Sequence, residues 1–126
     1  MKFLIIEDDR VKRLFLELFI KQKGYESFSF QSVQPAIKYT IQHSTEIDGI
    51  VLDLGLTSYD HTDDYSFTRG LDLVEKLKET GMYIPILINS STYIDLEKIQ
   101  ENYHSLIQRM DNDEWELRQF LNRIKK

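Results

Sequence analysis

The chain has no cysteine among its 126 residues, which excludes disulfides, thiolate chemistry and cysteine-ligated zinc sites. It has no long basic block, and its net charge of −5 disfavours binding of nucleic acid or a membrane surface through bulk charge. The apolar run after Lys2 is too short for a signal peptide or a membrane span. We therefore expect a cytoplasmic protein made of one domain over residues 1–126, with no output domain.

Three aliphatic runs each end near a carboxylate or a hydroxyl. Residues 3–6 lead into Glu7, Asp8 and Asp9, residues 50–52 into Asp53, and residues 84–88 into Asn89, Ser90 and Ser91. Continuous aliphatic runs are typical of buried parallel strands, and open α/β sheets bind ligands beyond the carboxyl ends of their strands. The three ends are therefore expected to gather several carboxylates in one crevice.

Strand and helix signals alternate along the whole chain. The predicted strands are residues 2–7, 27–30, a third that ends at 53, 84–89 and a weak fifth at 106–107. Helical spacing relates Val11, Leu14, Phe15, Leu18 and Phe19; then Val33, Ala36, Ile37, Thr40 and Ile41; then Leu71, Val74 and Leu77; then Ile94 and Ile99; and finally Leu117, Phe120, Leu121 and Ile124. This alternation predicts an α/β fold with a parallel sheet.

The gathered carboxylates are suited to phosphoryl chemistry. A carboxylate can attack phosphorus to form an aspartyl-phosphate, and like charges held close together need a cation or a proton between them. Glu7, Asp8 and Asp53 are the residue types that hold Mg²⁺, and Ser90 can donate to a phosphoryl oxygen. The alternative is structural, because Asp8 or Asp9 can simply cap the helix that follows.

Four segments carry a resemblance to a known family. They are FLIIEDD at residues 3–9, IVLDLGL at 50–56, GLDLV at 70–74 and PILINSS at 85–91. In this order they resemble the receiver domain of two-component response regulators, over nearly the whole chain. The resemblance implies a flavodoxin-like (βα)5 fold, a doubly wound parallel sheet with strand order 2-1-3-4-5.

The resemblance also implies roles for individual residues. Asp53 matches the phosphoacceptor, Glu7 and Asp8 the acidic pair that holds Mg²⁺ together with Asp53, Gly55 the position whose backbone carbonyl binds the metal, and Ser90 the switch hydroxyl. A histidine kinase or a phosphotransfer protein is then the expected phosphoryl donor. The expected output is contact with a downstream protein partner, which the sequence does not name, through the face of the fourth helix, fifth strand and fifth helix.

The chain departs from the family pattern in three places. Gln108 stands at the position of the family lysine, and Arg109, one residue later, is a possible substitute cation that a regular strand would direct to the opposite face. Ser105 stands at the position of the switch aromatic, and nearby Tyr103 either replaces that aromatic or packs at a helix end. Residues 55–69 form a long irregular stretch with several aromatics, which indicates a lid over Asp53 or a docking surface.

These departures leave alternatives to a phosphorylated receiver. One is a phosphorylation-independent pseudo-receiver, a pure interaction module. Another is a phosphatase of the haloacid dehalogenase type, because residues 53–57 faintly echo its DxDxT motif. Gly55 replaces the second aspartate, the general acid of that motif, so we expect that the chain is not an enzyme.

Overall fold

The computed structural model describes residues 1–53, 66–89, 95–110 and 114–124 and contains one five-stranded parallel sheet. The strands are β1 (Lys2–Ile6), β2 (Glu26–Phe30), β3 (Gly49–Asp53), β4 (Ile86–Asn89) and β5 (Ile107–Met110). Their order is β2-β1-β3-β4-β5, and every neighbouring pair is parallel. The predicted fold class and strand order are confirmed.

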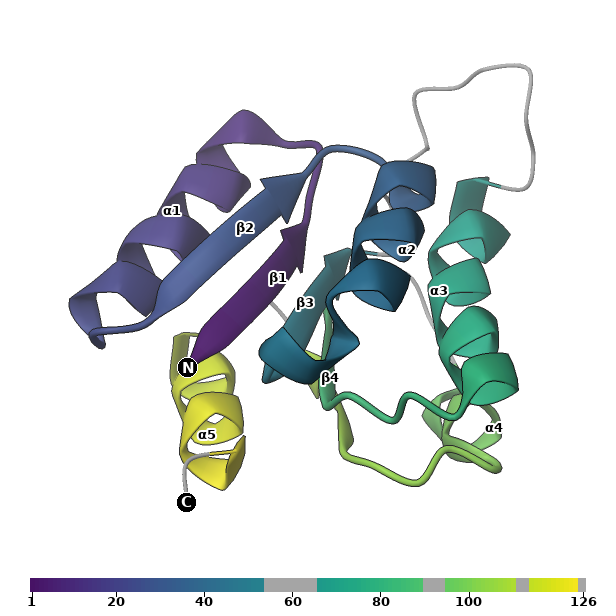
Figure 1. The fold of residues 1–126 in the computed structure, drawn as a ribbon. Helices are drawn as coiled ribbons and strands as arrows, with labels where there is room; N and C mark the ends of the chain where they lie inside the picture. Colours follow the sequence, from purple (N-terminus) through teal and green to yellow (C-terminus); the bar gives the residue numbers. More distant parts are fainter. Residues whose placement is uncertain (54–65, 90–94, 111–113, 125–126) are drawn as a thin grey trace.

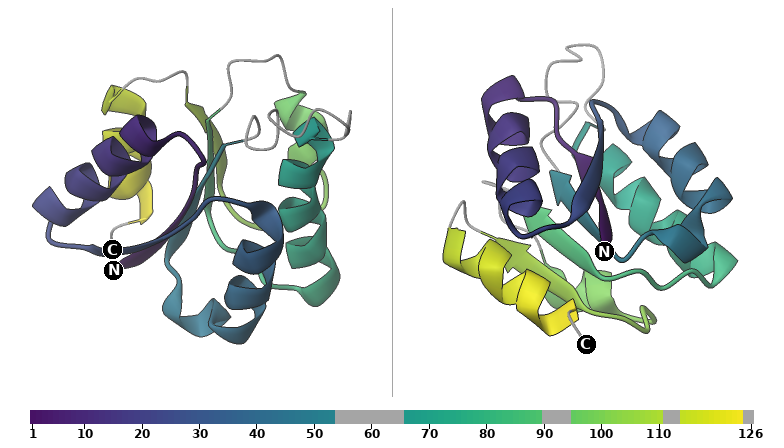
Figure 2. Two further views of the ribbon diagram at one scale, coloured as in Figure 1. Left: turned by 90° about the horizontal axis from the view of Figure 1, so that it is seen from above. Right: turned by 60° about the vertical axis from the view of Figure 1, so that its left-hand side comes forward.

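Helices cover both faces of this sheet (Figures 1 and 2). They are α1 (Arg10–Gln22), α2 (Val33–Gln42), α3 (Ser66–Thr80), the short α4 (Leu96–Gln100) and α5 (Glu114–Ile124), with a 3-10 turn at Ser44–Glu46. α1 and α5 lie on one face, and α2, α3 and α4 lie on the other. None of the described helices is both long enough and apolar enough to cross a membrane.

The central strands are buried on both faces, which explains their continuous aliphatic sequences. Phe3 and Ile5 of β1 pack in the core beneath α1 and α5, whereas Leu4 and Ile6 pack in the core beneath α2 and α3. Side chains of successive strand residues point to opposite faces, so one strand feeds both cores. The carboxyl ends of β1, β3 and β4 lie side by side at one edge of the sheet.

Helix α1 differs from the prediction in the face that it buries. Its buried residues are Leu16, Phe19 and Ile20. Of the five residues whose spacing predicted the helix, only Phe19 is buried, and Val11, Leu14, Phe15 and Leu18 are exposed. The helix is apolar on two faces, and the spacing identified the outer one.

Some element ends also differ from the sequence prediction. β1 ends at Ile6, and β5 spans Ile107–Met110, four residues where the sequence indicated two. Asp9 caps α1, since its side chain accepts hydrogen bonds from the backbone N–H groups of Val11 and Lys12. The structural alternative is thus correct for Asp9, which leaves Asp8 available for another role.

Candidate functional site

Three carboxylates meet at the carboxyl edge of the sheet. Glu7 and Asp8 directly follow β1, and Asp53 is the last residue of β3, the strand beside it. One carboxylate oxygen from each of the three lies within 4.8 Å of the others. The parallel register brings them together, because Ile6, the last residue of β1, pairs with Leu52, and Glu7 and Asp53 each follow this pair by one residue.

Glu7 is the most unusual member of this cluster. Its side chain is 1% exposed, and the two carboxylate oxygens have different surroundings. Oε2 accepts a hydrogen bond of 3.1 Å from the backbone N–H of Asp9, whereas Oε1 is buried without a hydrogen-bond partner among the described residues. Burial, and then the hydrogen bond and negative charge of Asp53, raise the pKa of Glu7 to about 8.

The pKa of Asp8 is shifted in the same direction as that of Glu7. Burial and the negative charge of Asp53 raise the pKa of the Asp8 carboxyl above its ordinary value. Both members of the acidic pair are therefore less stable as anions than they would be in water. A divalent cation placed among them would reverse this effect, because it stabilises the charged form of each.

The donor set fits Mg²⁺. Its three members are carboxylates, which this ion prefers, and they leave room for the waters that it usually keeps. The buried Oε1 of Glu7 supplies a direct observation, since a polar atom without a partner in a closed site is costly unless an ion or proton satisfies it. Glu7, Asp8 and Asp53 are the residues that would hold the metal.

Two further polar residues border the cluster: Asn89, which the sequence placed at this edge without a role, and Lys12, which the sequence reasoning missed. Asn89 ends β4, is buried, and is the register partner of Asp53. Lys12, in the first turn of α1, lies near enough for its positive charge to lower the pKa of Glu7, against the larger opposing effects. Both line a hollow of about 380 Å³ beside the site. The sequence feature that could have identified Lys12 is its position about one helical turn after Glu7 and Asp8.

The structure does not bring the Gln108 side chain to the carboxylates. Its amide Nε2 donates to the backbone carbonyl of Glu116, and its Oε1 accepts from Arg123, so both ends are bound to α5. The register of β5 is continuous, with Gln108 beside Leu87 and Arg109 beside Ile88. Gln108 and Arg109 therefore point to opposite faces of the sheet, as expected for a regular strand.

The aromatic residue that precedes β5 packs in the protein core. Tyr103 is buried, and its hydroxyl donates a hydrogen bond of 2.5 Å to the backbone carbonyl of Ile84. Burial raises the pKa of this phenol well above its ordinary range. Its ring packs edge-on against Tyr83, with ring centres 5.4 Å apart. The alternative in which Tyr103 packs at a helix end is the one that the structure supports.

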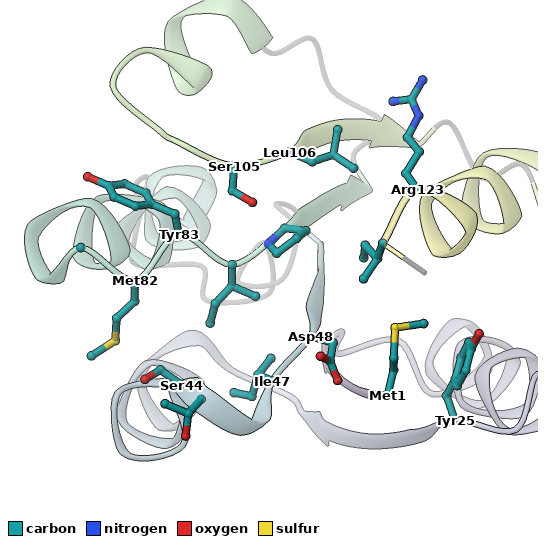
Figure 3. A pocket seen from close by; sticks show the side chains of 15 residues that line it. Met1, Tyr25, Ser44, Ile47, Asp48, Met82, Tyr83, Ser105, Leu106 and Arg123 are labelled. Carbon is teal, nitrogen blue, oxygen red and sulfur yellow. The ribbon is translucent and has the colours of Figure 1, made fainter. Parts of the chain in front are cut away.

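Ser105, at the family position of the switch aromatic, lies away from the carboxylates. It lines a pocket of about 1010 Å³ at the opposite, amino-terminal edge of the sheet, together with Tyr83 and Leu106 (Figure 3). Asp48 and Arg123 give this pocket one charge of each sign, and each already has a hydrogen-bond partner. The pocket contains none of the predicted site residues.

Replacing Tyr103 with phenylalanine tests this structural role. We expect the free energy of unfolding to fall by roughly 1–3 kcal/mol, because the buried carbonyl of Ile84 loses its donor. Chemical denaturation measures the change, and Mg²⁺ affinity should stay the same. Tyr83→Phe is the matched control, which keeps the ring contact and is expected to change stability by less than about 0.5 kcal/mol. A loss of Mg²⁺ affinity at unchanged stability would contradict the interpretation.

Two predicted site residues lie outside the described part of the chain. They are Ser90, the expected switch hydroxyl, and Gly55, the expected backbone ligand of the metal. Most of the long stretch after Asp53 lies outside it as well. The roles assigned to these residues stay predictions.

Comparisons with known proteins identify the fold. No family model matches the sequence, and no curated protein sequence matches it. Many solved structures match, among them chemotaxis protein CheY4 of Vibrio cholerae, with a TM-score of 0.73 and 16% identity over 98% of each chain. The receiver domain of Francisella response regulator 1452 has a TM-score of 0.74 and 17% identity, over 98% of this chain and 94% of that one.

A third similar structure is response regulator protein TrrA of Thermotoga maritima, solved in complex with Mg²⁺ and BeF. Its TM-score is 0.72, with 15% identity over 98% of each chain. At these identities the similarity establishes the fold alone. The chain has the fold of response regulator receiver domains.

Proposed function

We propose that the chain is a receiver domain that accepts a phosphoryl group on Asp53 with Mg²⁺ and signals by protein contact. The observation that carries the proposal is the cluster of Glu7, Asp8 and Asp53, in which one buried carboxylate oxygen has no hydrogen-bond partner among the described residues. The fold places this cluster where open α/β sheets bind their ligands. The proposed location is the cytoplasm, which agrees with the absence of cysteine.

The proposed donor is a phosphohistidine on a histidine kinase or a phosphotransfer protein. A carboxylate oxygen of Asp53 attacks phosphorus, and the new O–P bond forms as the P–N bond to the donor imidazole breaks. The imidazole nitrogen leaves with the electron pair and takes up a proton. Bound Mg²⁺ supplies positive charge that neutralises the carboxylates and the phosphoryl oxygens.

The residues of this chain have separate tasks in that reaction. Asp53 is the nucleophile, held at the end of a buried strand. Glu7 and Asp8 would hold the metal, and the hydrogen bond from the backbone N–H of Asp9 orients the Glu7 carboxylate. Lys12 and Asn89 border the site, and we propose that they donate hydrogen bonds to the phosphoryl group. Ser90 is the proposed switch hydroxyl.

A titration with Mg²⁺ and beryllofluoride, a phosphate mimic, tests the proposal. We expect Mg²⁺ alone to shift the backbone amide resonances near Glu7, Asp8 and Asp53. Beryllofluoride should then produce a second set of shifts that requires Asp53 and spreads to residues 90–110. The measurement is a series of ¹H–¹⁵N correlation spectra. Asp9→Asn is the matched control, since asparagine also caps a helix and the cluster keeps its charge.

A second candidate, the phosphorylation-independent interaction module, is favoured by one observation. Gln108, at the family lysine position, is bound to α5 and does not reach the carboxylates. The same titration separates the two functions. Shifts that stay near Asp53 after beryllofluoride binds would favour the module, and no response to either reagent would reject the phosphoacceptor role.

A further inference from the structure

Strand β2 is an edge strand that contains no lysine, proline or bulge. In the described sheet it pairs with β1 alone. Natural edge strands are commonly blocked by lysine, proline or a bulge, and the sequence of β2, ESFSF, contains neither residue and pairs with β1 in continuous register. An exposed edge of this kind is a template for pairing with another strand.

The direction of the backbone groups shows which residues of β2 are available. The N–H of Glu26 donates to Met1, and the carbonyl of Phe30 accepts from Glu7, so both residues direct their polar groups toward β1. Since these directions alternate along a strand, Phe28 also faces β1. Ser27 and Ser29 therefore present their N–H and C=O groups at the open edge.

An apolar surface lies beside this edge. The outer side of α1 exposes Val11, Leu14 and Leu18 to 75%, 51% and 56% of their full area, and Phe28 of β2 is exposed to 41%. Leu14, Leu18 and Phe28 line a groove of about 570 Å³ between α1 and β2, which also includes Ser27. The small serine side chain leaves this groove open.

We propose that this surface, formed by β2 and the outer side of α1, is the interface of a symmetric dimer. Two copies pair their β2 strands antiparallel about a twofold axis at Phe28, which joins the two five-stranded sheets. The open backbone groups determine the register. Ser27 of each copy exchanges two hydrogen bonds with Ser29 of the other, and the two Phe28 residues face each other as a pair without hydrogen bonds.

The side chains agree with this register. The twofold axis keeps α1 of both copies on the same face of the joined sheet, above the serines of the two edges. Serine is small, so Leu14 and Leu18 of one copy have room to meet Leu18 and Leu14 of the other. On the opposite face, Phe28 is already supported by the ring of Tyr39, with ring centres 5.6 Å apart, and is preorganised for an aromatic pair.

The available area is close to what a stable dimer needs. The exposed side chains of α1 and Phe28 offer on the order of 500 Å² per copy, given that a large aromatic side chain covers about 150–250 Å². A standard interface buries roughly 800 Å² per partner, and the backbone of β2 and the rims of the groove supply the remainder. Apolar patches of this size on a soluble domain mark interaction surfaces. The proposal does not depend on phosphorylation of Asp53.

Light scattering coupled to size exclusion tests the dimer, which should have twice the 15.0 kDa mass of one chain. Ser27→Pro removes an N–H that points away from β1, so the fold should persist while each dimer loses two hydrogen bonds. We expect a dissociation constant raised by about tenfold or more. Ser27→Ala keeps the N–H and should leave the dimer unchanged. A monomeric parent chain, or a dimer equally stable in both variants, would overturn the proposal.

Cross-linking tests the register independently. The chain lacks cysteine, so Phe28→Cys introduces a single thiol on the twofold axis. Paired Cα atoms of this type lie about 4.5 Å apart, within the range that a disulfide spans. Mild oxidation should therefore cross-link this variant and not Trp115→Cys, a control on α5 at a position that is more exposed, 61% against 41%. Cross-linking of both to the same extent would exclude this register.

A further pair of variants tests the proposed contact between the α1 helices of the two copies. Leu18→Glu places a charge in the apolar contact and should dissociate the dimer, whereas Asn122→Glu adds the same charge at an exposed position of α5 and should not. If both variants stay dimeric, a different surface joins the copies. If the parent binds an acidic peptide or lipid vesicles as a monomer, the surface serves another partner and the dimer is rejected.

Discussion

Replacing Asp53 with asparagine is expected to abolish Mg²⁺-dependent labelling by a small acyl phosphate. Asparagine has nearly the same shape but lacks the anionic oxygen that attacks phosphorus. Its loss also removes one of the three carboxylates of the proposed metal site. Incorporation of the phosphoryl group, measured by intact mass, should fall to background while the circular dichroism spectrum stays unchanged.

The matched control for this experiment is Asp9→Asn. Asp9 lies two residues after Glu7 and carries the same charge, but its side chain caps α1 and is not part of the metal cluster. Labelling of this variant should match that of the parent chain. Equal labelling of Asp53→Asn and the parent would show that another residue accepts the phosphoryl group, and an unlabelled parent with intact fold would reject the chemistry.

The second large effect is expected from Glu7→Gln in the absence of metal. The raised pKa keeps the Glu7 carboxyl of the folded chain protonated up to about pH 8, whereas the unfolded chain loses this proton near the ordinary glutamate pKa of 4.5. Between these values the folded state binds more protons, so the free energy of unfolding falls as pH rises. At about 1.4 kcal/mol per pKa unit, the lost stability amounts to a few kcal/mol by pH 8.

Glutamine removes this loss because it never carries the charge, and its amide can donate to Asp53. The metal-free variant should therefore melt roughly 5–10 °C above the parent at pH 8 and close to it at pH 5. Mg²⁺ should stabilise the parent at pH 8 and have little effect on the variant, which lacks one ligand. Melting curves at the two pH values, with and without Mg²⁺, measure both effects. A parent whose stability does not fall between them would contradict the raised pKa.

Much of the fold was predictable because it depends on local patterns. Aliphatic runs and helical spacing alternate strictly, which predicts a parallel sheet, whereas the strand order 2-1-3-4-5 came from the resemblance to receiver domains. The element ends were less predictable. β5 extends to Met110 through Gln108 and Arg109. The polar side chains of these two residues interrupt the apolar pattern, and the strand forms there because it pairs with β4.

The candidate site was predictable for a related reason. Residues that end neighbouring parallel strands must meet at one edge of the sheet, and the structure does bring Glu7, Asp8 and Asp53 together. Their roles as metal ligands and phosphoacceptor remain predictions. Asn89 was expected at this edge but was given no role. Lys12 was missed, because its nearness to the carboxylates depends on how α1 is placed on the sheet.

The sequence by itself determined the order of the elements and the edge at which the carboxylates gather, since both follow from periodicity and from parallel pairing. Only the tertiary structure decided which side of α1 is buried, because leucine and phenylalanine occupy two sides of that helix and spacing alone does not choose between them. It also decided that Gln108 binds α5 and that one oxygen of Glu7 is left without a hydrogen-bond partner among the described residues. Burial of a side chain depends on distant segments that pack over it, and no local pattern contains that information.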